Sequence, residues 1–113
     1  MSATSLLNDN IIRSNGWVDI FKTEPLDPGM YILVFYTTLK AIDLDGGFYI
    51  TTLKTSLNNG LRQSISIHGN DNVFSINLVI TCTLSKKTEV IAQVFAEKET
   101  RYVYSNYYYV RLR

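Results

Sequence analysis

The residues that could carry metal or acid–base chemistry are few in this chain, and they are scattered. His68 is the only histidine, and no HxH or HxxE spacing surrounds it, so a zinc site would lack ligands. Asp43 and Asp45 precede Gly46 as in the start of a calcium loop, but the remaining oxygen ligands and the closing glutamate are missing. The pattern favours an ordinary turn, and we expect neither a metal nor a cofactor.

The nucleophilic side chains also lack the surroundings that would activate them. Ser64, Ser66 and Ser75 have no GxSxG context, and no glycine-rich phosphate loop occurs. Cys82 is the only cysteine, which excludes an internal disulfide, and it falls in an apolar row where burial makes a thiol inert. We therefore predict that the protein is not an enzyme, with a small enzyme of unrecognised type as the remaining alternative.

Tyrosine is the unusual residue type, with eight in the chain. Those near the end are Tyr102, Tyr104, Tyr107, Tyr108 and Tyr109. If the last strand alternates, Tyr108, Val110 and Leu112 face the core, and the outward side chains are Tyr107, Tyr109, Arg111 and Arg113. Interfaces favour Tyr and Arg, and aromatic rings stack on sugars. An ordinary half-buried strand, a subunit interface and a sugar- or peptide-binding patch all fit this pattern.

Strands must position these side chains, because period-two alternation dominates the sequence. Residues 73–84 show it most clearly. One face carries Phe74, Ile76, Leu78, Ile80, Cys82 and Leu84, and the other carries Ser75, Asn77, Thr81 and Thr83. Residues 29–38 are apolar on both faces, with Met30, Ile32, Val34 and Tyr36 on one and Tyr31, Leu33, Phe35 and Thr37 on the other. One of those two faces must therefore be covered by something other than the core.

The remaining segments predict further strands separated by turns. Strands are expected at 16–22, 48–55, 61–68 and 101–113, with turns at 43–47, 58–60 and 69–72. Residues 86–98 fit a strand or a helix, and the β-branched residues among them favour the strand. Seven or eight strands predict an all-β fold, an antiparallel, jelly-roll-like β-sandwich. Residues 1–15 form an N-terminal arm or edge strand, and residues 16–113 form a single domain.

Composition limits the classes of partner. With 113 residues, 46% hydrophobic and 19% charged, the chain is typical of one globular domain. Its net charge of +1 and scattered Lys and Arg predict no nucleic-acid binding. No apolar run is long enough to span a membrane, and residues 1–9 lack the features of a secretory signal. If strands 29–38 and 101–113 are neighbours, their sheet has an apolar outer face, which predicts a homo-oligomer.

The segment Pro28 to Phe35 resembles the "proline/glycine, x, tyrosine, apolar run" strand of the tumour necrosis factor and complement globular-head superfamily. The 88–95 segment, the aromatic closing segment 107–112 and the preceding Gly16-Trp17 extend the resemblance over residues 16–113. Lys86-Lys87-Thr88 and Tyr109-Val110-Arg111 depart from that pattern. Such jelly rolls also form the heads of phage and viral fibres, spikes and receptor-binding proteins. The resemblance implies a homotrimer with Tyr107, Tyr109 and Arg111 at subunit contacts, beside Tyr31 and Phe35.

Two functions are therefore expected. The first is a non-enzymatic assembly and attachment module, a homotrimeric viral or phage fibre- or spike-type head at a virion or extracellular surface, which meets a cell-surface glycan or protein receptor. The alternative is a monomeric carbohydrate-binding module that uses Trp17 and exposed tyrosines, with Tyr102 and Tyr104 as candidates.

Overall fold

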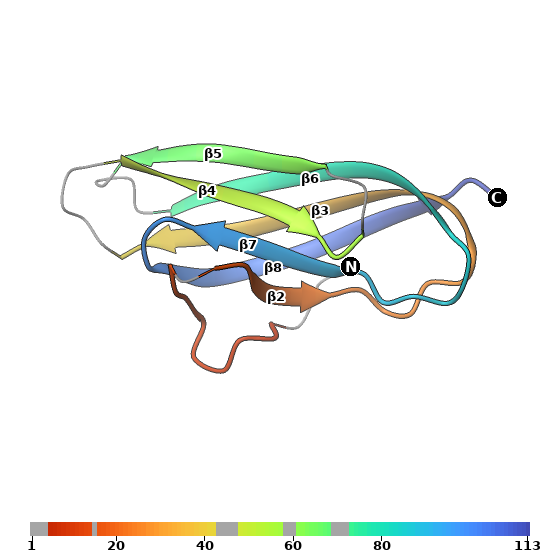
Figure 1. The fold of residues 1–113 in the computed structure, drawn as a ribbon, viewed down its shortest axis with the longest axis horizontal. Coiled ribbons are helices and arrows are strands. Elements are labelled where there is room, and N and C mark those ends of the chain that lie inside the picture. The colour runs from red at the N-terminus through yellow and green to blue at the C-terminus, as the bar shows by residue number, and fades with distance from the viewer. Residues whose placement is uncertain (1–4, 15, 43–47, 58–60, 69–72) are drawn as a thin grey trace.

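The fold consists of two antiparallel sheets of four strands each (Figure 1). The computed structural model describes residues 5–14, 16–42, 48–57, 61–68 and 73–113, and for Phe48, Ile67 and His68 it describes the backbone alone. The strands are β1 (Ile11–Ile12), β2 (Val18–Lys22), β3 (Gly29–Ala41), β4 (Phe48–Thr55), β5 (Arg62–His68), β6 (Val73–Leu84), β7 (Ile91–Ala96) and β8 (Thr100–Arg111). The expected all-β antiparallel sandwich is confirmed, and residues 86–98 contain strand β7 rather than a helix.

The strand order is that of a jelly roll. One sheet has the order β1-β8-β3-β6 and the other β2-β7-β4-β5. The first four strands pair with the last four in reverse order, as β1 with β8, β2 with β7, β3 with β6, and β4 with β5. A long antiparallel ribbon rolled up on itself produces this pattern. The predicted turns at 43–47, 58–60 and 69–72 lie outside the described residues.

The core lies between the two sheets and follows the alternation of the long strands. Completely or almost completely buried side chains include Leu33, Phe35, Leu39, Ile76, Ile80, Leu53 and Val94. Phe21 of β2 and Phe35 of β3 face each other across the sandwich, with ring centroids 5.8 Å apart. The predicted inward row of β6 is confirmed, because its members are buried or half-buried and lie in the core.

The N-terminal segment closes one edge of each sheet. Leu6 N donates to Ile20 O of β2 at 2.8 Å, and Ser5 forms a bridge with Phe21. Further on, β1 pairs with the start of β8. Residues 5–12 therefore belong to the sandwich. The described part of the chain contains no helix with the length and apolar character needed to cross a bilayer.

The predicted orientation of the last strand is wrong. Tyr107 is buried at 5% exposure, whereas Tyr108, Val110 and Leu112 are exposed. The alternation predicted for this segment is present, but with the opposite phase. The strand also contains a β-bulge: Thr38 pairs with Tyr104 and Leu39 with Tyr102, which leaves Val103 without a partner on β3. One extra residue inverts the alternation beyond it, so the phase set by the buried Tyr102 does not carry over to Tyr107 and its successors.

The bulge leads to a prediction about the deletion of Val103. Without Val103, Tyr102 and Tyr104 become consecutive. Tyr102 already faces inward opposite Leu39, and Tyr104 already faces outward opposite Thr38, the preceding residue of β3. We expect the variant to fold with both parts of β8 in their present register, because a regular ladder replaces the bulge. Denaturant unfolding should remain a single cooperative transition. A variant that no longer unfolds cooperatively would contradict this account of the bulge.

Candidate functional site

The largest candidate surface is the outer side of the β8-β3-β6 sheet, which we call the apolar face. Cross-strand register aligns its side chains in rows, of which Tyr108, Val34 and Val79 form the central one. The face comprises Met30, Ile32, Val34, Tyr36 and Thr38 of β3, Ser75, Asn77, Val79, Thr81 and Thr83 of β6, and Tyr104, Asn106, Tyr108, Val110 and Leu112 of β8 and its end. None of these side chains is charged. The 29–38 strand and the last strand are neighbours, so the condition stated for an apolar outer face of this sheet is met.

The centre of the apolar face is open to solvent. Val79 is 61% exposed, Val110 58% and Tyr108 54%. A shallow hollow of about 500 Å³ lies there, lined by Val34, Tyr36, Asn77, Val79, Asn106 and Tyr108. If a partner covered the centre of the apolar face, these apolar and aromatic side chains would be removed from water. Removal of apolar surface from water is the main favourable term in protein association.

Polar groups on the apolar face bond mainly to one another. Tyr36 Oη lies 3.1 Å from Ser75 Oγ, and Thr38 Oγ1 donates to Tyr36 Oη at 3.1 Å. Hydrogen bonds from the Ser75 and Thr38 hydroxyls lower the pKa of Tyr36. Asn106 Nδ2 donates to Tyr108 Oη at 2.9 Å. These contacts hold the two tyrosine rings in place around the apolar centre.

The structure does not place the predicted interface residues on this face. Tyr31 and Phe35 are 2% and 0% exposed, and with Tyr107 they belong to the core. Tyr109 is half-buried, and its ring meets that of Tyr31 edge-on at 5.8 Å. Arg111 is exposed and donates to Pro28 O. Residues so deeply buried within one chain cannot make subunit contacts, so the predicted interface roles of Tyr31, Phe35 and Tyr107 are wrong.

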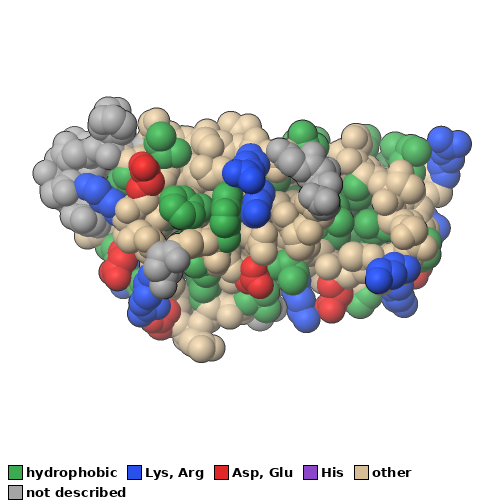
Figure 2. All heavy atoms as spheres, viewed as in Figure 1, with side chains coloured by type: hydrophobic (Ala, Val, Ile, Leu, Met, Phe, Trp, Pro, Cys, Tyr) green, Lys and Arg blue, Asp and Glu red, His purple; other side chains and the backbone are tan. Residues whose placement is uncertain are grey.

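A second candidate surface surrounds Trp17 on the outer side of the other sheet. Trp17 is 37% exposed, and its ring centroid lies 5.8 Å from that of Phe95. Lys54 Nζ lies 4.3 Å from the centre of the indole, and Arg62 Cζ lies 5.3 Å from it. Both cations are therefore within cation–π distance of one ring. This sheet is nearer the viewer in Figure 1, and Figure 2 shows basic and hydrophobic side chains together on it.

The three residues proposed for sugar binding do not form one site. Trp17 lies on the outer side of the β2-β7-β4-β5 sheet, whereas Tyr104 lies on the apolar face of the opposite sheet. Tyr102 is buried at 7% exposure, and burial raises its pKa. The predicted role of Tyr102 in ligand binding is wrong, because its ring lies in the core.

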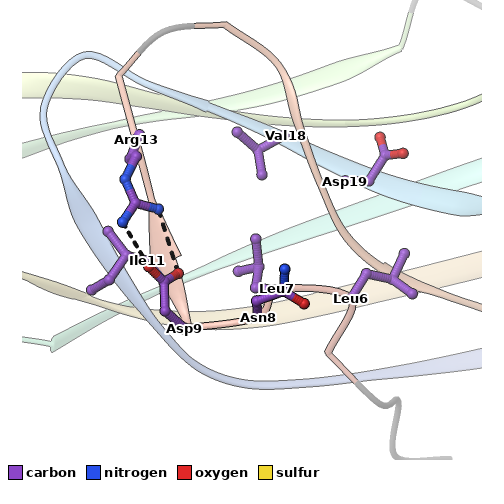
Figure 3. A pocket seen from close by; sticks show the side chains of 8 residues that line it. All are labelled: Leu6, Leu7, Asn8, Asp9, Ile11, Arg13, Val18 and Asp19. Carbon is purple, nitrogen blue, oxygen red and sulfur yellow. Dashed lines mark hydrogen bonds and ion pairs between the residues drawn. The ribbon is translucent and has the colours of Figure 1, made fainter.

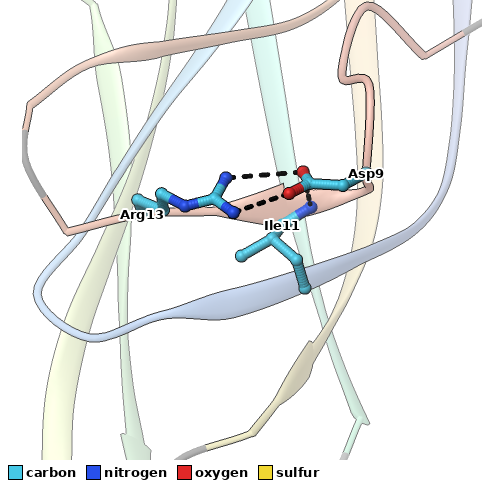
Figure 4. Close-up of polar contacts among 3 residues, drawn as sticks. All are labelled: Asp9, Ile11 and Arg13. Carbon is cyan, nitrogen blue, oxygen red and sulfur yellow. Dashed lines mark hydrogen bonds and ion pairs between the residues drawn. The ribbon is translucent and has the colours of Figure 1, made fainter.

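The hollow beside the N-terminal segment has a structural explanation. It measures about 450 Å³, and Figure 3 shows the side chains that line it. Its charged pair is Asp9 and Arg13, joined at 2.6 Å (Figure 4). Asp9 Oδ1 also accepts from Ile11 N at 3.1 Å, and the bond from Arg13 lowers the pKa of Asp9. Both charges serve the turn that leads into β1, and Asp19, which also lines the hollow, accepts from Gln93 Nε2 through its Oδ1.

Those residues weighed for chemistry that the structure describes form no metal-binding cluster. Cys82 points toward the core and is half-buried, and burial raises the pKa of its thiol. Among the described residues, no three His, Cys, Asp or Glu side chains cluster as metal ligands would. Asp43, Asp45 and the His68 side chain lie outside the described part of the chain.

Sequence reasoning missed Lys54 and Arg62, which are far from Trp17 in the chain. The sequence showed only that each of them lies on a predicted strand. It contained no signal that both side chains would lie over the indole of Trp17. Comparison of the chain with protein-family models and with curated proteins finds no match. The resemblance to the globular-head superfamily therefore stays a prediction.

Proposed function

We propose that this protein is a non-enzymatic assembly module that associates with copies of itself through the apolar face. The observation that carries this proposal is the cross-strand row of Tyr108, Val34 and Val79, in which Tyr108 and Val79 are exposed and Val34 is half-buried, on a face without charged side chains. Protein interfaces have this composition at their centre, where charges are depleted and aromatic residues and Met are enriched.

The charges at the ends of the apolar face fit the same arrangement. Lys40 and Arg101 are paired beyond one end of it, and Arg113 follows Leu112 at the other. An apolar centre with charged ends is typical of an interface core and its polar rim. A second copy is the favoured occupant, because an uncharged surface requires no partner of complementary charge.

The role we propose for the assembly is that of a homotrimeric fibre- or spike-type head of a virus or phage, at a virion or extracellular surface. The jelly-roll strand order and the resemblance of residues 16–113 to trimeric globular heads support it. Self-association through the apolar face leaves the Trp17 side of the sandwich facing outward, where it can meet a receptor.

Light scattering tests the assembly. We expect a mass near three times 12.9 kDa for the protein and a monomer for Val79→Asp, because a carboxylate at the centre of the contact would lose its hydration. Val79 is exposed on an edge strand, so the fold should tolerate the change. Ile50→Asp is the control, because Ile50 is exposed on the other sheet. A monomeric native protein, or an oligomer that survives Val79→Asp unchanged, would overturn the proposal.

A further inference from the structure

Two like charges lie directly opposite each other on the outer side of the β2-β7-β4-β5 sheet. Lys54 of β4 and Arg62 of β5 are register partners, so their side chains emerge side by side. Like charges at directly opposed positions destabilise an antiparallel pair. The ion pairs in the described part of the chain are Arg13–Asp9, Lys22–Glu89 and Lys87–Asp27, and they include neither Lys54 nor Arg62.

Trp17 holds these two charges in place. Both cations lie over the Trp17 ring, and the same ring packs against the ring of Phe95. The negative face of an indole attracts cations, so it reduces the cost of bringing them together but removes no net charge. The nearest acid in the same row is Asp19, two strands from Lys54, and its Oδ1 accepts from Gln93 Nε2 at 2.8 Å. The pair therefore presents a local positive charge of fixed position.

Neutral hydrogen-bonding groups surround the pair. Thr52 and Ser64 form the next cross-strand row, with their hydroxyls 2.8 Å apart, and Gln93 lies beside Lys54. A hollow of about 260 Å³ adjoins both cations and Gln93. Hydroxyl and amide groups match the hydroxyls of a sugar, and two adjacent cations match an anionic substituent.

We propose that Lys54, Arg62 and Trp17 form a binding site for an acidic glycan, with its sulfate or carboxylate held between the two cations. A nucleic acid fits less well, since it needs a longer basic stripe and an open aromatic face on which to stack. The site names a ligand class for the attachment part of the proposed function. It lies on the sheet opposite the apolar face, so it does not depend on assembly.

The single tryptophan makes the site its own reporter. Trp17 is the only tryptophan of the chain, so a change in its fluorescence registers a ligand that displaces Lys54 or Arg62 from the ring. The probes are a heparin hexasaccharide for sulfate, sialyllactose for carboxylate and lactose as the neutral sugar. We expect one or both acidic probes to titrate the fluorescence, more weakly as salt is added, and lactose to leave it unchanged.

Charge-matched variants separate a local site from diffuse attraction. Lys54→Ser with Arg62→Ser should weaken binding roughly tenfold or more, because both charge-assisted contacts are lost. Lys22→Ser with Lys87→Ser removes the same charge at exposed ion pairs and should change the affinity less than about twofold. Calorimetry provides the affinities of both pairs.

Several outcomes would overturn the site. They are no response to either acidic probe, equal loss in the two double variants, and equal binding of a short single-stranded DNA. The same titration on Val79→Asp separates this inference from the assembly: unchanged binding by a monomer supports the site, and loss of binding contradicts its independence from the apolar face. The mass measurement alone decides the assembly.

Discussion

Phe35→Ala is expected to lower the free energy of unfolding by about 3–5 kcal/mol. Phe35 is fully buried and meets Phe21 of the other sheet at 5.8 Å, so its loss leaves a cavity where the two sheets join. A domain of this size has roughly 5–15 kcal/mol of stability, so the variant will be near its folding limit. Denaturant unfolding followed by circular dichroism measures the change.

The next residue serves as the matched control for Phe35. Tyr36 also carries an aromatic ring but lies half-buried on the apolar face, so Tyr36→Ala should cost much less stability and act on the assembly. If Phe35→Ala lowered the oligomeric mass while unfolding normally, the core position of Phe35 would be contradicted and the interface role expected from sequence would return.

Tyr107→Ala is expected to cost about 3–5 kcal/mol by the same mechanism, with a second component from hydrogen bonding. Tyr107 is buried, and its Oη accepts from Glu24 N at 2.9 Å. Tyr107→Phe keeps the ring and removes this acceptor, so it should cost about 1 kcal/mol. Unfolding curves of the two variants separate packing from the hydrogen bond.

Tyr108 completes that experiment from the opposite side of the strand. Tyr108 is 54% exposed, so Tyr108→Ala should barely affect unfolding of the isolated domain but should weaken self-association. The reverse result, with Tyr108→Ala unfolding the domain and Tyr107→Ala only dissociating it, would restore simple alternation along β8 and refute the bulge at Val103.

Local alternation was sufficient wherever the ladder is regular. Val73–Leu84 pairs with β3 over its length without a register shift, and the faces expected from its sequence are those observed. The apolar outer side of residues 29–38 was likewise readable, because every second residue of an unbroken strand faces the same way. These patterns also predicted the number of strands, and they predicted that the apolar outer side of one sheet must be covered by something other than the core.

The candidate sites were only partly readable for a different reason. The face to which Tyr107 belongs could not be read from the chain, because a bulge separates it from the buried Tyr102 and a bulge is defined by the partner strand rather than by the sequence that contains it. Trp17, Lys54 and Arg62 come from three segments, and their meeting depends on which strands become neighbours.

By itself, the sequence of this protein determined that it builds an antiparallel sandwich with more apolar surface than one core can use, since alternation and composition are local properties of each segment. The tertiary structure alone decided which side chains form that surface, that Trp17 and Tyr104 lie on opposite sheets, and that two cations share one indole. The physical reason is that sheet pairing joins residues distant in the chain, and a one-residue shift in that pairing reverses every side chain beyond it.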